Sequence, residues 1–124
     1  MITINDIIAF VEKAMQENLN IRTNIRKWDN FEELSITIYD PEEYPNGFSI
    51  SCFSENNSSK IQMTETYSNW VDIETSEMDI AQFRVLVLKA DEYSKNKVIE
   101  KFKNFFNNET REKILNINNL NDDD

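Results

Sequence analysis

The stretch Leu34-Ser35-Ile36-Thr37-Ile38-Tyr39 alternates apolar and hydroxyl-bearing side chains. A period of two is typical of a strand that turns one face to the core and the other to water. The same alternation precedes this stretch in Ile21–Arg26 and follows it in Phe48–Phe53. Three such runs in succession predict antiparallel strands that pair in sequence order.

Two weaker runs, at residues 60–66 and 69–74, extend the same pattern. Turn-forming residues separate the runs: Asp40–Glu43 includes a proline, Pro45–Gly47 holds the single glycine, and Glu55–Ser59 is polar. Gly47 is the residue best able to take a positive φ, so we expect a reversal there. The sequence therefore predicts an antiparallel meander of four or five strands.

A helix is predicted before the strands, from about residue 4 to residue 18. Apolar residues recur there at the spacing of one helical face, with Thr3 or Asn5 available as the N-cap. This stripe consists of Ile4, Ile7, Ile8, Val11, Met15 and, just past the end, Leu19.

A long helical region is predicted after the strands, with Ser76 as its N-cap and neither glycine nor proline up to Phe106. Its apolar stripe is Phe83, Val87, Ala90, Ser94, Val98, Phe102 and Phe105. The pattern fits one helix, or two that break at residues 94–96. A strand at Val85–Leu88 is the competing interpretation, and Thr110–Ile117 is expected to add a further turn or two.

These elements predict an α+β fold, with both helices on one face of the sheet. We expect one domain over residues 1–115 and a disordered acidic tail over residues 116–124. The C-terminal helical region is expected to cover the strand face of Leu34, Ile36, Ile38, Phe48 and Ile50. The residues expected to do so are Phe83, Leu86, Val87, Val98, Phe102, Phe105 and Phe106.

The composition argues against catalysis and against a cofactor. The chain has no histidine, one glycine and one cysteine, Cys52. Without histidine to activate it, Cys52 is expected to be a small buried apolar side chain rather than a nucleophile. The acidic turns lack the spacing and central glycine of a calcium-binding loop. We therefore expect no enzyme, no metal and no cofactor.

Charge is distributed unevenly along the chain, whose net charge is −10. Residues 28–82 hold twelve acids and one base, Lys60. Such a field repels nucleic acid and anionic membranes and attracts basic partners. Acidity for solubility alone is the alternative explanation. With no basic leader or long apolar run, we expect a cytoplasmic protein, either monomeric or homodimeric.

The order of strands predicts that many acids meet at one end of the meander, which we call the acidic end. Two aromatic residues lie among them in an expected loop and are typical anchors of protein interfaces. Their alternative role is a lid on the sheet. The predicted partner-binding residues are Asp29, Glu32, Glu33, Glu55, Glu74, Glu77, Asp79, Trp28 and Phe31.

The small α+β domain, the acidic middle, the missing catalytic residues and the opening Ile4-Asn5-Asp6-Ile7-Ile8 together resemble small phage-encoded anti-CRISPR proteins in character. This resemblance implies a stoichiometric inhibitor in a bacterial host. Its partner would be a nucleic-acid-binding effector, for example a CRISPR effector such as Cas9, whose basic DNA site it occupies as a DNA mimic. The alternatives are an immunity protein that neutralises a toxin, and a phage structural protein that self-associates through its C-terminal helix.

Overall fold

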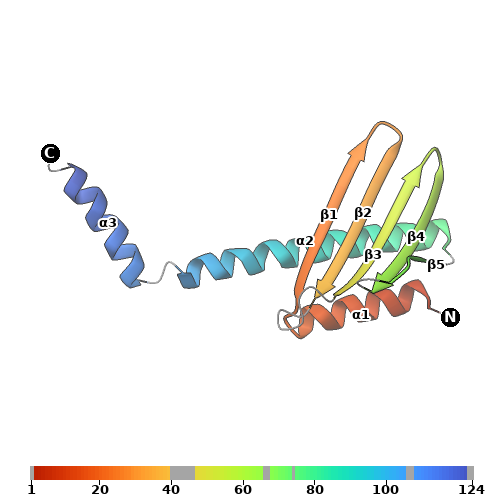
Figure 1. Cartoon of the computed structure of the whole chain (residues 1–124), viewed down its shortest axis with the longest axis horizontal. Coiled ribbons are helices and arrows are strands. Elements are labelled where there is room, and N and C mark those ends of the chain that lie inside the picture. Colours follow the sequence, from red (N-terminus) through yellow and green to blue (C-terminus); the bar gives the residue numbers. More distant parts are fainter. Residues whose placement is uncertain (1, 40–46, 66–67, 74, 106–107, 123–124) are drawn as a thin grey trace. The chain divides into compact units, whose positions relative to one another are not determined.

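The computed structural model describes residues 2–39, 47–65, 68–73, 75–105 and 108–122. Its elements are α1 (Ile4–Gln16), β1 (Asn20–Trp28), β2 (Phe31–Tyr39), β3 (Gly47–Glu55), β4 (Ser58–Glu65), β5 (Val71–Ile73), α2 (Glu77–Phe105) and α3 (Asn108–Asp122). The strands form one antiparallel sheet in the order β1-β2-β3-β4-β5, and α1 and α2 run across it (Figure 1). The predicted α+β fold is confirmed.

The core lies on one face of the sheet. Register pairs Leu34 with Cys52, Cys52 with Ile61, and Ile36 with Ile50, so these side chains share a face, and all five residues are buried. Both α1 and α2 supply buried residues to the same cluster. The helices contribute Ile4, Ile7, Val11, Ala14, Phe83, Leu86, Val87 and Ala90. Cys52, 1% exposed, is the buried apolar side chain that was predicted.

The helix α2 is continuous, without the break considered at residues 94–96 and without a strand at Val85–Leu88. At 29 residues it is about 44 Å long, roughly twice the width of five strands spaced about 4.8 Å apart. Its buried residues, Phe83, Leu86, Val87 and Ala90, all lie in its first part. The expectation that Val98, Phe102 and Phe105 cover the strands is wrong, because these residues are 49%, 58% and 69% exposed.

Polar contacts hold the first part of α2 to the rest of the core. Thr23 on β1 donates to Asp91 at 2.8 Å, and the Tyr93 hydroxyl donates to the carbonyl of Leu19 at 2.8 Å. Lys89 reaches Glu12 on α1 at 3.3 Å. Tyr93 is the last α2 residue that makes one of these contacts.

The chain forms two compact units, Met1–Ser94 and Lys95–Asp124. The first unit holds the sheet, α1 and the start of α2. The second holds the end of α2 and α3. Helix α3 extends from Asn108 to Asp122, so it includes most of the segment for which a disordered tail was expected.

The residues with left-handed backbone conformation in the described turns are asparagine and aspartate. Two-residue turns join β1 to β2 and β3 to β4, since Trp28 pairs with Phe31 and Glu55 pairs with Ser58. Positive φ occurs at Asn18, Asp29, Asn56 and Asn57, where short polar side chains lower the steric cost. No described glycine has a positive φ, so the role expected of Gly47 is wrong; Gly47 instead begins β3. The expected turn residues 40–46 lie outside the described residues.

The first turn of α1 is closed by a capping box. Asp6 N–H donates to the Thr3 hydroxyl at 3.3 Å, and Thr3 N–H donates to the Asp6 carboxylate at 2.8 Å. Of the two predicted candidates, Thr3 and Asn5, Thr3 is thus the N-cap. Hydrogen bonds from the backbone and then the side chain of Thr3 hold the pKa of Asp6 below its usual value.

Asp6→Asn is expected to flatten the pH dependence of stability below pH 5. A depressed folded pKa means that ionised Asp6 stabilises the fold above its unfolded pKa of about 3.9 and loses this effect as pH falls through the folded value. The difference in melting temperature between wild type and variant should be largest at pH 5 and should shrink as pH falls through the lowered pKa of Asp6. Circular dichroism melts measure it. Glu92→Gln, at an exposed position, is the control, and an equally flattened profile there would contradict the prediction.

Candidate functional site

The predicted site residues do not form one acidic surface. Alternation along β2 sends the side chains of Glu32 and Glu33 to opposite faces of the sheet. Glu32 shares the core face with Leu34, whereas Glu33 shares the opposite face with Phe31. Glu32 and Glu33 therefore both lie near the β1–β2 turn at the acidic end, but on opposite faces of the sheet.

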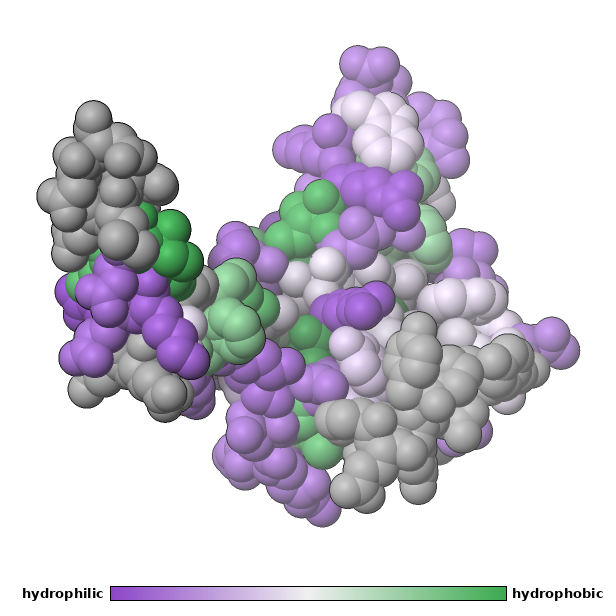
Figure 2. Space-filling model, turned by 60° about the vertical axis from the view of Figure 1, so that its left-hand side comes forward, coloured by the Kyte–Doolittle hydropathy of each residue, from purple (hydrophilic) through white to green (hydrophobic). Residues whose placement is uncertain are grey.

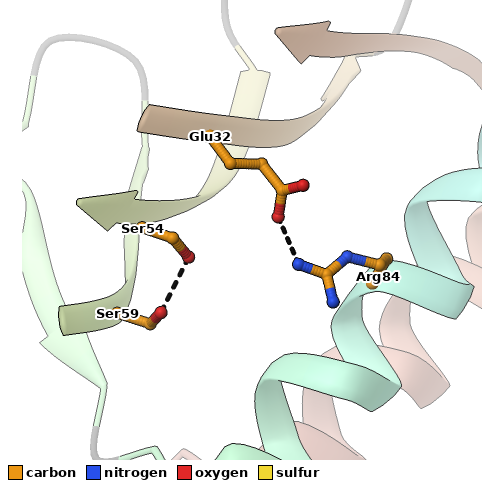
Figure 3. Close-up of polar contacts among 4 residues, drawn as sticks. All are labelled: Glu32, Ser54, Ser59 and Arg84. Carbon is orange, nitrogen blue, oxygen red and sulfur yellow. Dashed lines mark hydrogen bonds and ion pairs between the residues drawn. The ribbon is translucent and has the colours of Figure 1, made fainter. Parts of the chain in front are cut away.

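Each of these two glutamates is engaged by an arginine. Arg84 on α2 forms an ion pair with Glu32, whose side chain is 18% exposed; Figure 3 shows the two side chains extending toward each other. The Ser54 and Ser59 hydroxyls, 2.7 Å apart in the same view, link β3 to β4. On the opposite face, Arg26 Nε lies 3.4 Å from Glu33 Oε2, and the two residues are direct cross-strand partners. Much of the charge of both carboxylates is thus compensated.

Replacing Glu32 with lysine is expected to lower the free energy of unfolding by about 1–2 kcal/mol, because it sets two positive charges together at a half-buried position. The urea concentration at the midpoint of unfolding, at an unchanged m-value, measures this loss. Glu92→Lys changes the net charge equally at an exposed site and should leave the midpoint nearly unchanged. The exchanged pair Glu32→Lys with Arg84→Glu should recover most of the loss; failure to recover would show that the pair itself contributes little.

The remaining predicted acids are divided between two places. Asp29 lies in the β1–β2 turn, and Glu55 ends β3 as the cross-strand partner of Phe31. Glu77 and Asp79 lie in the first turn of α2, where Asp79 accepts from Ser76 N–H at 2.9 Å and its own N–H donates to the Ser76 hydroxyl at 3.2 Å. Ser76 is thus the predicted cap, and Asp79 has a structural role. Glu74 lies outside the described residues.

The two predicted aromatic residues do meet, but in strands rather than in a loop. Trp28 ends β1 and Phe31 begins β2, and their rings stack with centroids 4.6 Å apart. Phe53 on β3 joins them, with its ring 6.4 Å from that of Phe31. Trp28 is 51% exposed. We call Trp28, Phe31 and Phe53, with Asp29 and Glu55, the aromatic tip.

The two hairpins are joined beside the aromatic tip. Asn56 in the β3–β4 turn donates its N–H to the carbonyl of Asn30 in the β1–β2 turn at 3.3 Å. Both turns have two residues, which leaves few backbone degrees of freedom. The aromatic tip is therefore built on strand ends and tight turns, and its shape is set before any partner binds.

The face of the sheet that bears the aromatic tip is otherwise polar. Hydroxyl groups lie along its centre, where Thr37 and Ser49 are hydrogen-bonded at 3.0 Å. Arg22 lies over the ring of Tyr39, with its guanidinium carbon 5.5 Å from the centroid. Arg26 and Lys60 share this face, because along their strands they alternate with Ile25 and Ile61, whose cross-strand partners Leu34 and Cys52 are on the core face. Reasoning from the sequence missed the positions of Arg26 and Arg84, since these depend on register.

The single cysteine and the side chains able to ligate a metal are the candidate reactive groups among the described residues. Burial raises the pKa of the Cys52 thiol above its usual value, so the thiolate that would act as nucleophile is disfavoured. Among the described residues, no three histidine, cysteine, aspartate or glutamate side chains are placed to hold a metal ion. No helix in those same ranges is long and apolar enough to cross a bilayer.

Comparison with known proteins returns no relative. No protein-family model matches the chain, and no curated protein or solved structure is significantly similar to it.

Proposed function

We propose that this protein is a non-enzymatic inhibitor that binds a basic, nucleic-acid-binding effector through its aromatic tip and so blocks the effector's DNA site. The observation that carries the proposal is the stacked pair of Trp28 and Phe31, with Trp28 half exposed at the end of a hairpin. Tryptophan is among the residues most enriched at interface hot spots, where it is buried in a pocket of the partner.

The carboxylates around the aromatic pair favour a basic partner. Asp29 and Glu55 are exposed beside it, and the net charge of −10 adds a long-range attraction. Since Glu32 and Glu33 are paired with arginines, the charge available at the aromatic tip is smaller than a row of phosphates would carry. We therefore assign affinity chiefly to the aromatic residues, and association rate and choice of partner to the charge.

The proposal is tested by capture from a lysate of a low-GC bacterium. The protein is immobilised at low salt, bound proteins are eluted on a salt gradient, and mass spectrometry identifies them. We expect a nuclease or another DNA-binding effector, released by a few hundred millimolar salt because exposed charges are screened beyond about 8 Å at 0.15 M. Added duplex DNA should compete with the protein for this effector.

Other outcomes would redirect or overturn the proposal. Capture of a toxin that DNA does not displace would favour an immunity protein. Direct binding of a labelled single-stranded oligonucleotide to the protein itself would contradict it, since aromatic rings on a sheet can also stack on bases. Recovery of virion components alone would favour a structural protein.

The contribution of the acidic residues to effector binding can be measured separately from that of the aromatic residues. The double variant Asp29→Lys with Glu55→Lys removes both carboxylates at the aromatic tip, and Glu65→Lys with Glu92→Lys changes net charge equally at exposed sites elsewhere. A larger loss of capture for the first variant than for the second places the contact at the aromatic tip. Equal losses would mean that only net charge matters.

A further inference from the structure

The strand β1 (Asn20–Trp28) is a long, regular strand at one edge of the sheet. It is first in the strand order, so its neighbour in the described sheet is β2 alone. All nine residues of β1 pair with β2 in one register without a bulge, and none of them is proline. Long edges of this kind accept a further strand unless side chains or other elements prevent it. Figure 2 turns the side of Figure 1 on which β1 lies toward the viewer and shows hydrophobic atoms among hydrophilic ones there.

The outer side of β1 presents backbone groups that β2 does not bind. The two-residue β1–β2 turn closes with a hydrogen-bonded pair between Trp28 and the first residue of β2. Such pairs alternate with non-hydrogen-bonded pairs along an antiparallel ladder, so Thr23, Ile25 and Lys27 direct their N–H and C=O groups away from β2. None of the backbone hydrogen bonds described outside helices and strands involves residues 20–28. The edge therefore offers donors and acceptors to an added strand.

Strand β1 is basic, although the chain as a whole has a net charge of −10. It carries Arg22, Arg26 and Lys27, all exposed, and no acidic residue. Arg26 contacts Glu33 at 3.4 Å, whereas the ion pairs among the described residues give Arg22 and Lys27 no carboxylate partner. Arg22 donates from Nε to the Tyr39 hydroxyl at 3.1 Å, and its guanidinium carries further donors. Exposed charges are screened beyond about 8 Å at 0.15 M, so a strand beside β1 meets these bases rather than distant acids.

We infer that β1 binds an extended acidic segment of another protein as an additional strand of the sheet. In strand addition of this kind, backbone hydrogen bonds supply the affinity and alternate side chains supply the choice of partner. Opposite Arg22 and Arg26, on one face, the segment carries aspartate or glutamate at two positions four residues apart. On the other face it carries β-branched residues, which pack beside Ile25, 47% exposed at this edge.

The charges of β1 also select against a second copy of this chain. Pairing of two β1 strands would set their bases against one another, which is unfavourable. Charged side chains on an edge strand thus prevent self-association and leave an acidic strand as the complement. The positions involved, Arg22–Lys27, precede the aromatic tip, so binding at this edge does not rest on the proposed function. A synthetic peptide is therefore the probe, and failure to capture an effector leaves its outcome unchanged.

An NMR titration of the full-length, isotope-labelled protein with the capped peptide Thr-Glu-Val-Thr-Val-Glu-Thr tests the inference. The two glutamates of the peptide are four residues apart, and its side-chain pattern is the same in parallel and antiparallel pairing. We expect it to bind at least about tenfold more tightly than the same peptide with lysine in place of glutamate, because like charges placed opposite each other are unfavourable. No binding at about 2 mM peptide, or equal affinity for the two peptides, overturns the inference.

Amide hydrogen exchange shows whether the peptide pairs with the backbone. In the free protein the N–H groups of Ile25 and Lys27 should exchange quickly, and saturating peptide should slow them at least about fivefold. The N–H groups of Asn24 and Arg26, already bonded to β2, should exchange slowly in both states. Binding without protection at β1, or with protection at β5, the other edge of the sheet, overturns the inference. Protection at β1 that grows with protein concentration in the absence of peptide would identify a second copy and would likewise overturn it.

Two variants separate the backbone contribution from the charge contribution. Ile25→Pro removes an N–H that points away from β2, so the fold should persist while peptide affinity falls at least about tenfold. Arg22→Glu should also lower affinity about tenfold, and it decides the question where Ile25→Pro loses structure by circular dichroism. The matched control is Lys60→Glu, since Lys60 is an exposed base on the same polar face but lies on β4. It should leave affinity within about twofold, and an equal loss for both charge variants would contradict binding at β1.

Discussion

Truncating Phe83 to alanine is expected to lower the free energy of unfolding by about 3–5 kcal/mol, because a large, fully buried ring leaves a cavity that the rigid sheet cannot fill. Phe83 is 0% exposed and belongs to the cluster in which α1, α2 and the strands meet. Against a typical total stability of about 5–15 kcal/mol, this loss is a large fraction. Urea denaturation followed by circular dichroism measures it.

Two valines on the same helix provide the control. Val87 is 0% exposed and Val85 is 65% exposed, so the same truncation to alanine removes core contacts at one position and almost none at the other. Val87→Ala is expected to destabilise by about 1–3 kcal/mol, and Val85→Ala by less than about 0.5 kcal/mol. Equal effects would mean that α2 does not pack on the sheet through the face described above.

Trp28→Ala is expected to weaken binding of the captured effector by at least about thirtyfold, which corresponds to a hot-spot contribution of about 2 kcal/mol or more. The indole is half exposed in the free protein and stacks on Phe31, so it is held ready for a partner at little entropic cost. Titration of the purified effector by calorimetry measures the change.

Trp70→Ala is the matched control, since Trp70 is 47% exposed and precedes β5, away from the β1–β2 turn in the sheet. It should leave affinity within about twofold, the range expected of contacts outside a hot spot. Melting temperatures of both variants show whether loss of the stacked ring perturbs the fold. Equal losses of affinity, or none for Trp28→Ala, would contradict the proposed interface.

Much of the fold could be predicted from local pattern. Apolar residues recur every second position in Leu34–Tyr39 and every three to four positions in Ile4, Ile7 and Val11. These spacings follow from the backbone geometry of one strand or one helix, so they can be recognised without knowing the rest of the fold. Caps are equally local, since Thr3 and Asp6 are separated by one helical turn. The strands β1, β2, β3 and β4 are longer than the alternating runs from which they were predicted. The tight turns at Asp29 and Asn56 let cross-strand pairing continue up to the turns.

The candidate site was less predictable, because it depends on contacts between elements. Trp28 and Phe31 were singled out as aromatic residues among acids, but their stacking requires a two-residue turn that places them directly opposite each other. Phe53 joined the site only through the register of β3. Arg26 and Arg84, which engage the two glutamates, lie seven and 52 residues from them in sequence.

The sequence by itself determined the α+β class, the strand order and the burial of Cys52, because periodicity and turn chemistry act within a few residues. Tertiary structure alone decided which face each side chain occupies and how far the core extends. Glu32 and Glu33 are neighbours in sequence but lie on opposite faces of the sheet. The apolar stripe of α2 continues past Ser94, yet its buried residues, Phe83, Leu86, Val87 and Ala90, all precede that point.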